Sequence, residues 1–324
     1  MAAFLSDYGL FVLELVTVAV IVVVAALAII SAARKSPDSH GLVIDNINET
    51  IERRADTVRQ SLLGRRDARR QAKQRDKARK KGKKSESGRR RIFVLDFKGD
   101  IRASATASLR EEVTAVLTVA GDGDEVLLRL ENSGGAVHEH GLAASQLLRL
   151  RERGIPLTIV VDKVAASGGY LMAAVADKIV AAPFAIIGSI GVLLQLPNFH
   201  RLLGEKGIDF ELLTAGKYKR TLTLFGENTD EGREKMQQEL VEVHELFKQQ
   251  IKEQRPALDL ERIATGEHWY GRQALELGLI DEIGTSDTIL LQAVESADLY
   301  RVSYKRRKNF FERMMQGAEG LLRS

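Results

Sequence analysis

The sequence predicts an α/β domain preceded by an N-terminal transmembrane helix. Between about residues 91 and 163, apolar runs typical of strands alternate with helical patterns, which favours a largely parallel sheet. Near the N-terminus, an uncharged apolar run is long enough to cross a bilayer. With 324 residues and 44% hydrophobic content, the chain can bury one substantial core and still carry appendages.

The predicted membrane anchor lies at residues 1–35. Residues 15–33 read LVTVAVIVVVAALAIISAA, 19 residues without a charge. As a helix they span about 28 Å, close to the roughly 30 Å hydrocarbon core of a bilayer. Residues 31–33 mimic a signal-peptidase site, but the apolar run is longer than that of a cleaved signal peptide and no basic region precedes it. We therefore expect a retained anchor.

A basic linker is predicted at residues 36–91, partly helical and partly disordered. Residues 52–91 hold 18 Lys/Arg against 5 Asp/Glu, so the rest of a chain with net charge +4 is acidic. The linker suits either contact with anionic lipid head groups or a plain charged stalk. No aromatic residues are interleaved to stack on bases, so we expect no nucleic-acid partner. By the positive-inside rule, these charges favour a cytoplasmic body.

After the linker, the sequence predicts a folded domain in which apolar segments are separated by glycine and proline. An apolar run at residues 179–196 is long enough to suggest a second membrane span, but Pro183, Gly188 and Gly191 divide it into two short buried strands. Thr229 begins a long amphipathic helix that runs toward Gln254. The earlier elements are strands near residues 91–101, 126–131 and 156–163, and helices near residues 108–120 and 141–154.

Two strands end in loops of small residues, NSGG at residues 132–135 and AASGG at residues 165–169. In open α/β sheets, loops at the carboxyl ends of strands build the site. Ser167 has no convincing histidine partner, which suggests a Ser-Lys pair, although a helix N-cap is the alternative for this serine. The chain contains no cysteine, which excludes a thiol nucleophile and thiolate metal sites. Four lysines are candidates for the partner: Lys163, Lys178, Lys217 and Lys219.

His138 and His140 suggest a metal pair. They fall where a helix begins, however, and no third ligand is evident in the sequence. We therefore expect two surface histidines and no metal.

With both loops identified, the chain resembles the signal-peptide-peptidase family of membrane serine proteases, which shares the ClpP/crotonase fold. The similarity covers residues 92 to about 290. One departure is Ser133, where the family usually has a proline before the paired glycines. The matching segments are residues 94–99, 126–131, 134–135, 141–147, 162–170, 176–179, 182–192, 214–223, 226–229, 264–271 and 278–283.

The resemblance implies Ser167 as nucleophile and Lys219, which closes a G-x-x-K segment, as general base. It implies oxyanion or substrate contacts at Gly134, Gly135 and Gly168, and no cofactor or metal. Lysine accepts a proton only when neutral, and its reference pKa is about 10.4, so such a site must be dry enough to lower it. Loss of the proline at position 133 loosens the loop that carries the oxyanion donors.

The sequence therefore predicts a membrane-anchored serine endopeptidase of the bacterial inner membrane, with a protease domain at residues 92–297 and a basic amphipathic tail at residues 298–324. Expected substrates are peptides or unfolded segments such as signal-peptide remnants, and expected partners are membrane lipids. We also expect a homo-oligomer, in which the lysine comes from the same subunit or a neighbour. The orientation in the membrane is a point of conflict: the best-known relatives act outside the cytoplasm, whereas the charges after the anchor favour a cytoplasmic domain. The alternatives are a crotonase-like acyl-CoA enzyme and a non-catalytic membrane scaffold.

Overall fold

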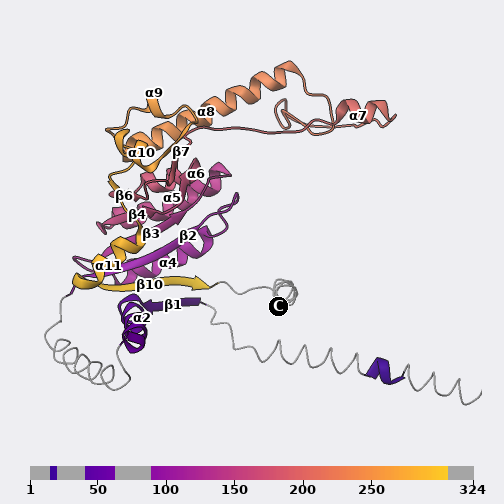
Figure 1. The fold of residues 1–324 in the computed structure, drawn as a ribbon. Coiled ribbons are helices and arrows are strands. Elements are labelled where there is room, and N and C mark those ends of the chain that lie inside the picture. Colours follow the sequence, from indigo (N-terminus) through magenta and orange to yellow (C-terminus); the bar gives the residue numbers. More distant parts are fainter. Residues whose placement is uncertain (1–14, 20–40, 63–88, 306–324) are drawn as a thin grey trace, which may run out of the picture. The chain divides into compact units, whose positions relative to one another are not determined.

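A computed structural model describes residues 15–19, 41–62 and 89–305 (Figure 1). The chain forms two compact units, residues 1–43 with 304–324 and residues 44–303. Residues 15–19 of the predicted anchor are helical, and the remainder of that anchor lies outside the described residues. Among the described residues, no helix combines the length and apolar character needed to cross a membrane.

A seven-stranded sheet forms the centre of the second unit, and its strand order is β1-β10-β2-β3-β4-β6-β9. Every pairing from β10 across to β9 is parallel, which confirms the predicted α/β class. The bounds are β1 Gly41–Asn46, β2 Arg91–Lys98, β3 Glu125–Glu131, β4 Leu157–Val161, β6 Lys178–Ala181, β9 Glu282–Ile283 and β10 Asp298–Lys305.

Helices cover both faces of this sheet. Because successive side chains of a strand point to opposite faces, Phe93 and Leu95 enter different layers from Val94. Phe93 and Leu95 pack with α4 (Thr106–Val119), α5 (Val137–Glu152) and α6 (Gly168–Ala174). Val94 packs with α11 (Ser286–Ser296), and Ile47 of α2 (Ile47–Leu62) adds to that layer.

A second, three-stranded sheet carries the loops of interest. It contains β5 (Val164–Ala166), β7 (Ile186–Gly188) and β8 (His268–Tyr270), with β7 parallel to β5 and antiparallel to β8. The apolar run at residues 179–196 enters the core as β6 and β7, so the prediction of buried strands is confirmed. The turn at residues 188–191 follows β7, and the two strands separate near Pro183 instead.

The predicted long helix is α8 (Asp230–Gln254), and it begins as expected. The Thr229 side chain accepts a hydrogen bond from the Gly232 N–H at 3.1 Å, which satisfies one free donor of the first turn. Phe247 and Ile251 are buried in the core, and α8 contacts α6. Two short helices follow, α9 (Leu260–Ile263) and α10 (Gly271–Glu276).

The folded domain extends beyond both of its predicted ends. Residues 298–305, expected to start the C-terminal tail, form strand β10 instead, with Leu299 and Val302 buried. On the other side, part of the predicted linker forms β1 and α2. Asn48 of α2 donates to the Ala297 carbonyl at 2.9 Å and accepts from the Leu299 N–H at 2.7 Å, which ties the helix to β10. Residues 306–324 of the tail lie outside the described residues.

Candidate active site

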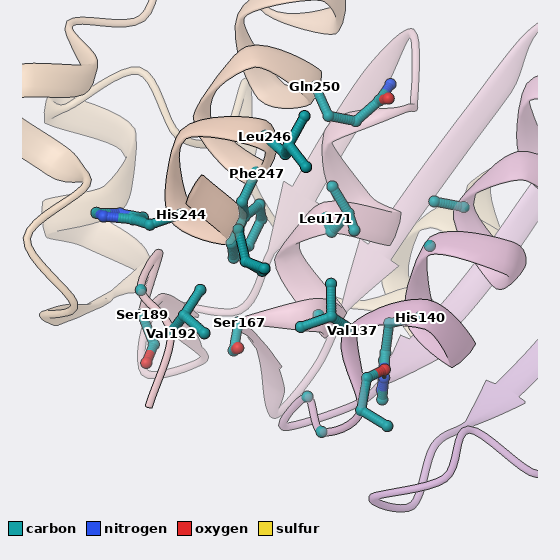
Figure 2. Close-up of a pocket in the computed structure, with 18 of the residues that line it drawn as sticks. Val137, His140, Ser167, Leu171, Ser189, Val192, His244, Leu246, Phe247 and Gln250 are labelled. Carbon is teal, nitrogen blue, oxygen red and sulfur yellow. Dashed lines mark hydrogen bonds between the residues drawn. The ribbon is translucent and has the colours of Figure 1, made fainter. Parts of the chain in front are cut away.

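A cavity of about 1250 Å³ lies among α5, α6, α8 and the loops that follow β3, β5 and β7. Figure 2 shows Ser167 near its centre, with Leu246 and Phe247 of α8 above and Val137 of α5 beside it. Most of the wall is apolar, and several of its large side chains are exposed, Leu193 and Leu246 among them. The apolar side chains larger than alanine that line it are Ile101, Val137, Leu148, Leu171, Val192, Leu193, Val243, Leu246 and Phe247.

Ser167 connects β5 to α6 in a strained backbone conformation, with φ 53° and ψ −123°. Its N–H donates to the Gly188 carbonyl at 2.7 Å, and its carbonyl accepts from the Leu171 N–H at 3.0 Å, so the surrounding structure fixes the turn. Its hydroxyl makes no capping hydrogen bond, which contradicts the N-cap alternative. Strain of about 1–3 kcal/mol at a non-glycine residue is typical of functional turns, including the strand-to-helix turn that presents the nucleophile of α/β-hydrolases.

The two glycine-containing loops meet at this serine. A Cβ atom placed on Gly134 would lie 2.7 Å from the Ser167 Cβ and 2.9 Å from the Gly168 nitrogen. Since Gly134 also has φ +89°, only glycine fits this contact. The structure thus brings together Ser167 and the three glycines that the sequence predicted.

Two of these glycines leave a backbone N–H available for an oxyanion. The Gly134 N–H already donates to the Asn132 Oδ1 at 2.9 Å. Within the described part of the chain, the N–H groups of Gly135 and Gly168 donate to no protein acceptor. Of the predicted donors, Gly135 and Gly168 are therefore the pair that the geometry leaves open.

The prediction of two surface histidines is wrong for His140. Its side chain is fully buried on α5 and lines the cavity, whereas the His138 side chain is 83% exposed. The two rings lie in different surroundings, so they do not form a pair of metal ligands. The helix begins at Val137, earlier than predicted, and this earlier start turns His140 inward.

Two further polar residues lie near Ser167 and are not among the site residues that the sequence predicts. Asn132 is buried directly before the glycine loop. Ser189 lines the cavity and has φ 50°, and its N–H donates to the Glu267 carbonyl at 2.6 Å. The sequence signal for Ser189 is its place between two glycines in GSIG, a pattern that by itself predicts only a turn.

The four candidate lysines differ in their partners. Lys163 pairs with Glu131 at 3.2 Å, and Lys178 pairs with Glu282. The ion pair with Glu231 at 2.6 Å raises the pKa of Lys217 and so favours the charged form, which cannot act as a base. Lys219 is exposed and forms no ion pair with any described residue.

Lys219 does not reach the cavity in this structure. It lies on a segment between β7 and α8, residues 192–228, which we call the arm; Figure 1 shows the arm, with α7 (His200–Glu205), extending away from the sheet. Among the described residues, no lysine lines the cavity. Aromatic side chains hold the arm together: Phe225 lies 6.1 Å from Phe199 and 5.7 Å from Phe210, measured between ring centroids.

The arm exposes many large apolar side chains. Leu213 is 92% exposed and Leu193 is 76% exposed, and no arm residue belongs to either buried core. Exposed apolar side chains that gather into a large patch are typical of interaction sites.

Comparison with known protein families finds two matching segments. Residues 149–300 match the family described as peptidase family S49, and residues 3–147 match the family described as peptidase family S49 N-terminal.

Individual relatives agree with this result. The chain is 47% identical to the probable protease SohB of Haemophilus influenzae over 97% of this chain and 93% of that protein. It is 59% identical to the probable protease SohB of Buchnera aphidicola subsp. Acyrthosiphon pisum over 70% of this chain and 68% of that protein. Among solved structures, a mutant of the 1510-N membrane-bound stomatin-specific protease with a substrate peptide aligns at 14% identity and a TM-score of 0.44, covering 71% of this chain and 98% of that one.

Proposed function

The chain belongs to peptidase family S49, with the SohB proteases among its relatives, and from that premise we propose that it is a membrane-anchored serine endopeptidase with Ser167 as nucleophile and Lys219 as general base. The observation that carries the proposal is the strained Ser167, placed in an apolar cavity where two glycine-containing loops meet. The proposed architecture of the domain is the ClpP/crotonase type.

In the proposed reaction, the Ser167 Oγ attacks the carbonyl carbon of a peptide bond while the neutral amine of Lys219 takes the hydroxyl proton. The carbonyl oxygen becomes an oxyanion and accepts hydrogen bonds from the N–H groups of Gly135 and Gly168. The C–N bond then breaks, and the leaving amine takes the proton from Lys219. Water, deprotonated by the same lysine, releases the acyl group from Ser167.

The apolar wall of the cavity serves both the base and the substrate. A surrounding with little water favours the neutral form of a lysine that enters it. The same wall would bury apolar side chains of an extended peptide, each CH₂ contributing about 0.8 kcal/mol. Apolar peptides such as signal-peptide remnants therefore fit the site better than charged ones.

Lys219 is proposed to act in the cavity of a neighbouring copy of the chain. In its own subunit it lies on the exposed arm, and the cavity wall holds no lysine among the described residues. Contact with a second copy would cover the exposed leucines of the arm and bring Lys219 to a serine in one step. The active form is thus a homo-oligomer, anchored in the bacterial inner membrane through residues 1–35.

The test is cleavage of an unfolded protein by the full chain in detergent, together with labelling by a fluorophosphonate, which phosphonylates reactive serines with loss of fluoride. The wild-type chain should cleave and label, and Ser167→Ala should do neither while its thermal unfolding is unchanged. Ser145→Ala is the matched control, since Ser145 also lines the cavity and its hydroxyl only donates to the Gly141 carbonyl at 2.9 Å. Full cleavage by Ser167→Ala would assign the nucleophile to another residue, and a wild-type chain that neither cleaves nor labels would favour an acyl-CoA enzyme or a scaffold.

A further inference from the structure

The loop after β3 is supported from behind by two buried polar side chains. Asn132 is 1% exposed and His140 is fully buried, and the two are hydrogen-bonded to each other. The proposed mechanism assigns neither of them a role. Buried polar groups are costly unless their hydrogen bonds are satisfied, so the pair requires an explanation.

The hydrogen bonds determine how both side chains are oriented. The Asn132 Oδ1 accepts from the Gly134 N–H at 2.9 Å and lies 3.2 Å from the His140 Nε2. A backbone N–H can only donate, so the atom facing it is the oxygen of the amide. Because the same oxygen faces His140, the ring must carry a hydrogen on Nε2 and donate it.

Asn132 also links the loop to the strand that leads to the nucleophile. Its N–H donates to the Val164 carbonyl at 2.9 Å, and its carbonyl accepts from the Ala166 N–H at 3.0 Å. The bond from the Gly134 N–H closes an Asx turn on this fixed base. The next N–H along the chain is that of Gly135, whose direction the turn therefore sets.

His140 contacts the second loop as well. A Cβ atom on Gly168 would lie 2.5 Å from the His140 Cγ, so the ring packs directly on the backbone that follows Ser167. The His140 Nδ1 lies 2.9 Å from the Ala136 carbonyl oxygen, a contact that is a hydrogen bond only when Nδ1 carries a hydrogen in addition to the one on Nε2. One side chain thus touches both segments that present oxyanion donors.

We propose that His140 is a positioning residue for the oxyanion hole, which acts through Asn132 to fix the peptide between Gly134 and Gly135. This inference rests on the proposed function and deepens it. Ser133 has no ring to restrain the loop, as a proline would have, and these hydrogen bonds supply the restraint instead. Oxyanion stabilisation depends on donors held in place before the reaction, so a loosened loop loses rate and not substrate affinity.

Three substitutions separate the hydrogen bond from mere packing. In His140→Gln the amide nitrogen can replace Nε2 and still donate to Asn132. In His140→Asn the amide nitrogen can replace only Nδ1, and in His140→Leu the side chain fills the space but forms no hydrogen bond. We expect kcat to fall about ten- to a hundredfold in the Leu and Asn variants with KM changed less than about twofold, and the Gln variant to recover most of the rate. Asn132→Ala should lower kcat similarly, and adding it to His140→Leu should cause little further loss.

A second measurement does not depend on activity. In the Ser167→Ala background, amide hydrogen exchange of a peptide spanning residues 130–137 should be faster in the Leu and Asn variants than in the Gln variant. Equal kcat and equal exchange in the Gln and Asn variants at equal thermal stability would overturn the role of His140. A wild-type chain that neither cleaves nor labels would contradict the proposed function, while the exchange result would still decide whether His140 holds the loop.

Discussion

At the scale of single residues, the chemistry depends on a few side chains whose surroundings differ sharply. Ser167 is recognisable because its backbone is strained and its hydroxyl does not cap α6. Lys217 and Lys219 lie two residues apart, yet only Lys217 is bound to a carboxylate, that of Glu231. The structure therefore separates two lysines that sequence spacing leaves equivalent.

This difference leads to a prediction about the base. Lys219→Ala should reduce cleavage at least about a thousandfold, because the serine loses its proton acceptor. Lys217→Ala should retain cleavage within about threefold, since it removes only an exposed ion pair. Steady-state cleavage by the two variants decides between the lysines, and the reverse result would assign the base to Lys217.

A second prediction concerns the close contact at Gly168. Gly168→Ala places a methyl group against the buried His140 ring, so we expect stability to fall by about 1–3 kcal/mol and cleavage at least about tenfold. Gly141→Ala is the control, because a Cβ there meets nothing within 4 Å and alanine favours a helix by about 0.5–1 kcal/mol. Urea unfolding and cleavage rates measure both effects. A Gly168→Ala chain as stable and active as wild type would refute the contact.

The sequence by itself leaves Ser167 open between a nucleophile and a helix N-cap, and the roles of Ser167 and the glycines follow from the family resemblance. The sequence did not predict the burial of His140 or its bond to Asn132. That bond joins a strand end to a helix through space, and no local pattern of residues encodes it. A histidine next to charged residues at a helix start is more often exposed, so the sequence favours a surface position for His140.

At the scale of elements, α8 closes the cavity and its C-terminal end is fastened to the sheet. Arg255, which ends the helix, donates two hydrogen bonds to Asp281, at 2.6 and 3.0 Å. The same carboxylate accepts from the Ile179 N–H of β6 at 2.7 Å. Burial raises the pKa of Asp281, but the hydrogen bonds from Arg255 and Ile179 outweigh it, and the pKa lies below its ordinary value.

Asp281→Asn should therefore destabilise the domain by about 1–2 kcal/mol near neutral pH. Because the folded-state pKa is lowered, this stabilisation is present above the unfolded-state pKa of about 4 and is lost as pH falls below it. Urea unfolding of both chains from pH 7 to pH 3 should show the difference shrinking only at the acid end. Glu282→Gln, at the neighbouring exposed pair with Lys178, should change little. A difference that does not depend on pH would contradict this assignment.

The main elements of the domain were predictable because their apolar periodicity is strong, as in β2, α4 and β3. Strand β10 was missed because its buried residues, Leu299 and Val302, are separated by polar ones and precede a basic run. The pairing of β1 and α2 with that strand joins segments about 250 positions apart, and Asn48 alone gives no sign of it.

At the scale of the whole molecule, the exposed arm is the feature on which the proposed homo-oligomer depends. The exposed leucines of the arm do not pack into the described core. The arm also places Lys219, the proposed base, outside the cavity wall. The sequence suggests an oligomer only through the family resemblance, because no local pattern of residues encodes contacts between copies of a chain.

Leu213→Asp should weaken this assembly without unfolding the subunit, since Leu213 is 92% exposed. Sedimentation in detergent should show a smaller species, and cleavage should fall at least about tenfold because a buried charge at an interface is costly. Leu291→Asp on α11 is the matched control, as Leu291 is 61% exposed but lies outside the arm. Unchanged sedimentation in Leu213→Asp would remove the arm from the interface.

The most direct test of the shared site is to mix two inactive chains. Ser167→Ala supplies an intact lysine and Lys219→Ala supplies an intact serine, so co-assembly of the two should restore about a quarter of wild-type cleavage if neighbouring copies complete each site at random. Each variant alone should stay inactive. A co-assembled mixture that remains as inactive as its parts would show that serine and lysine act within one chain, and would contradict the account.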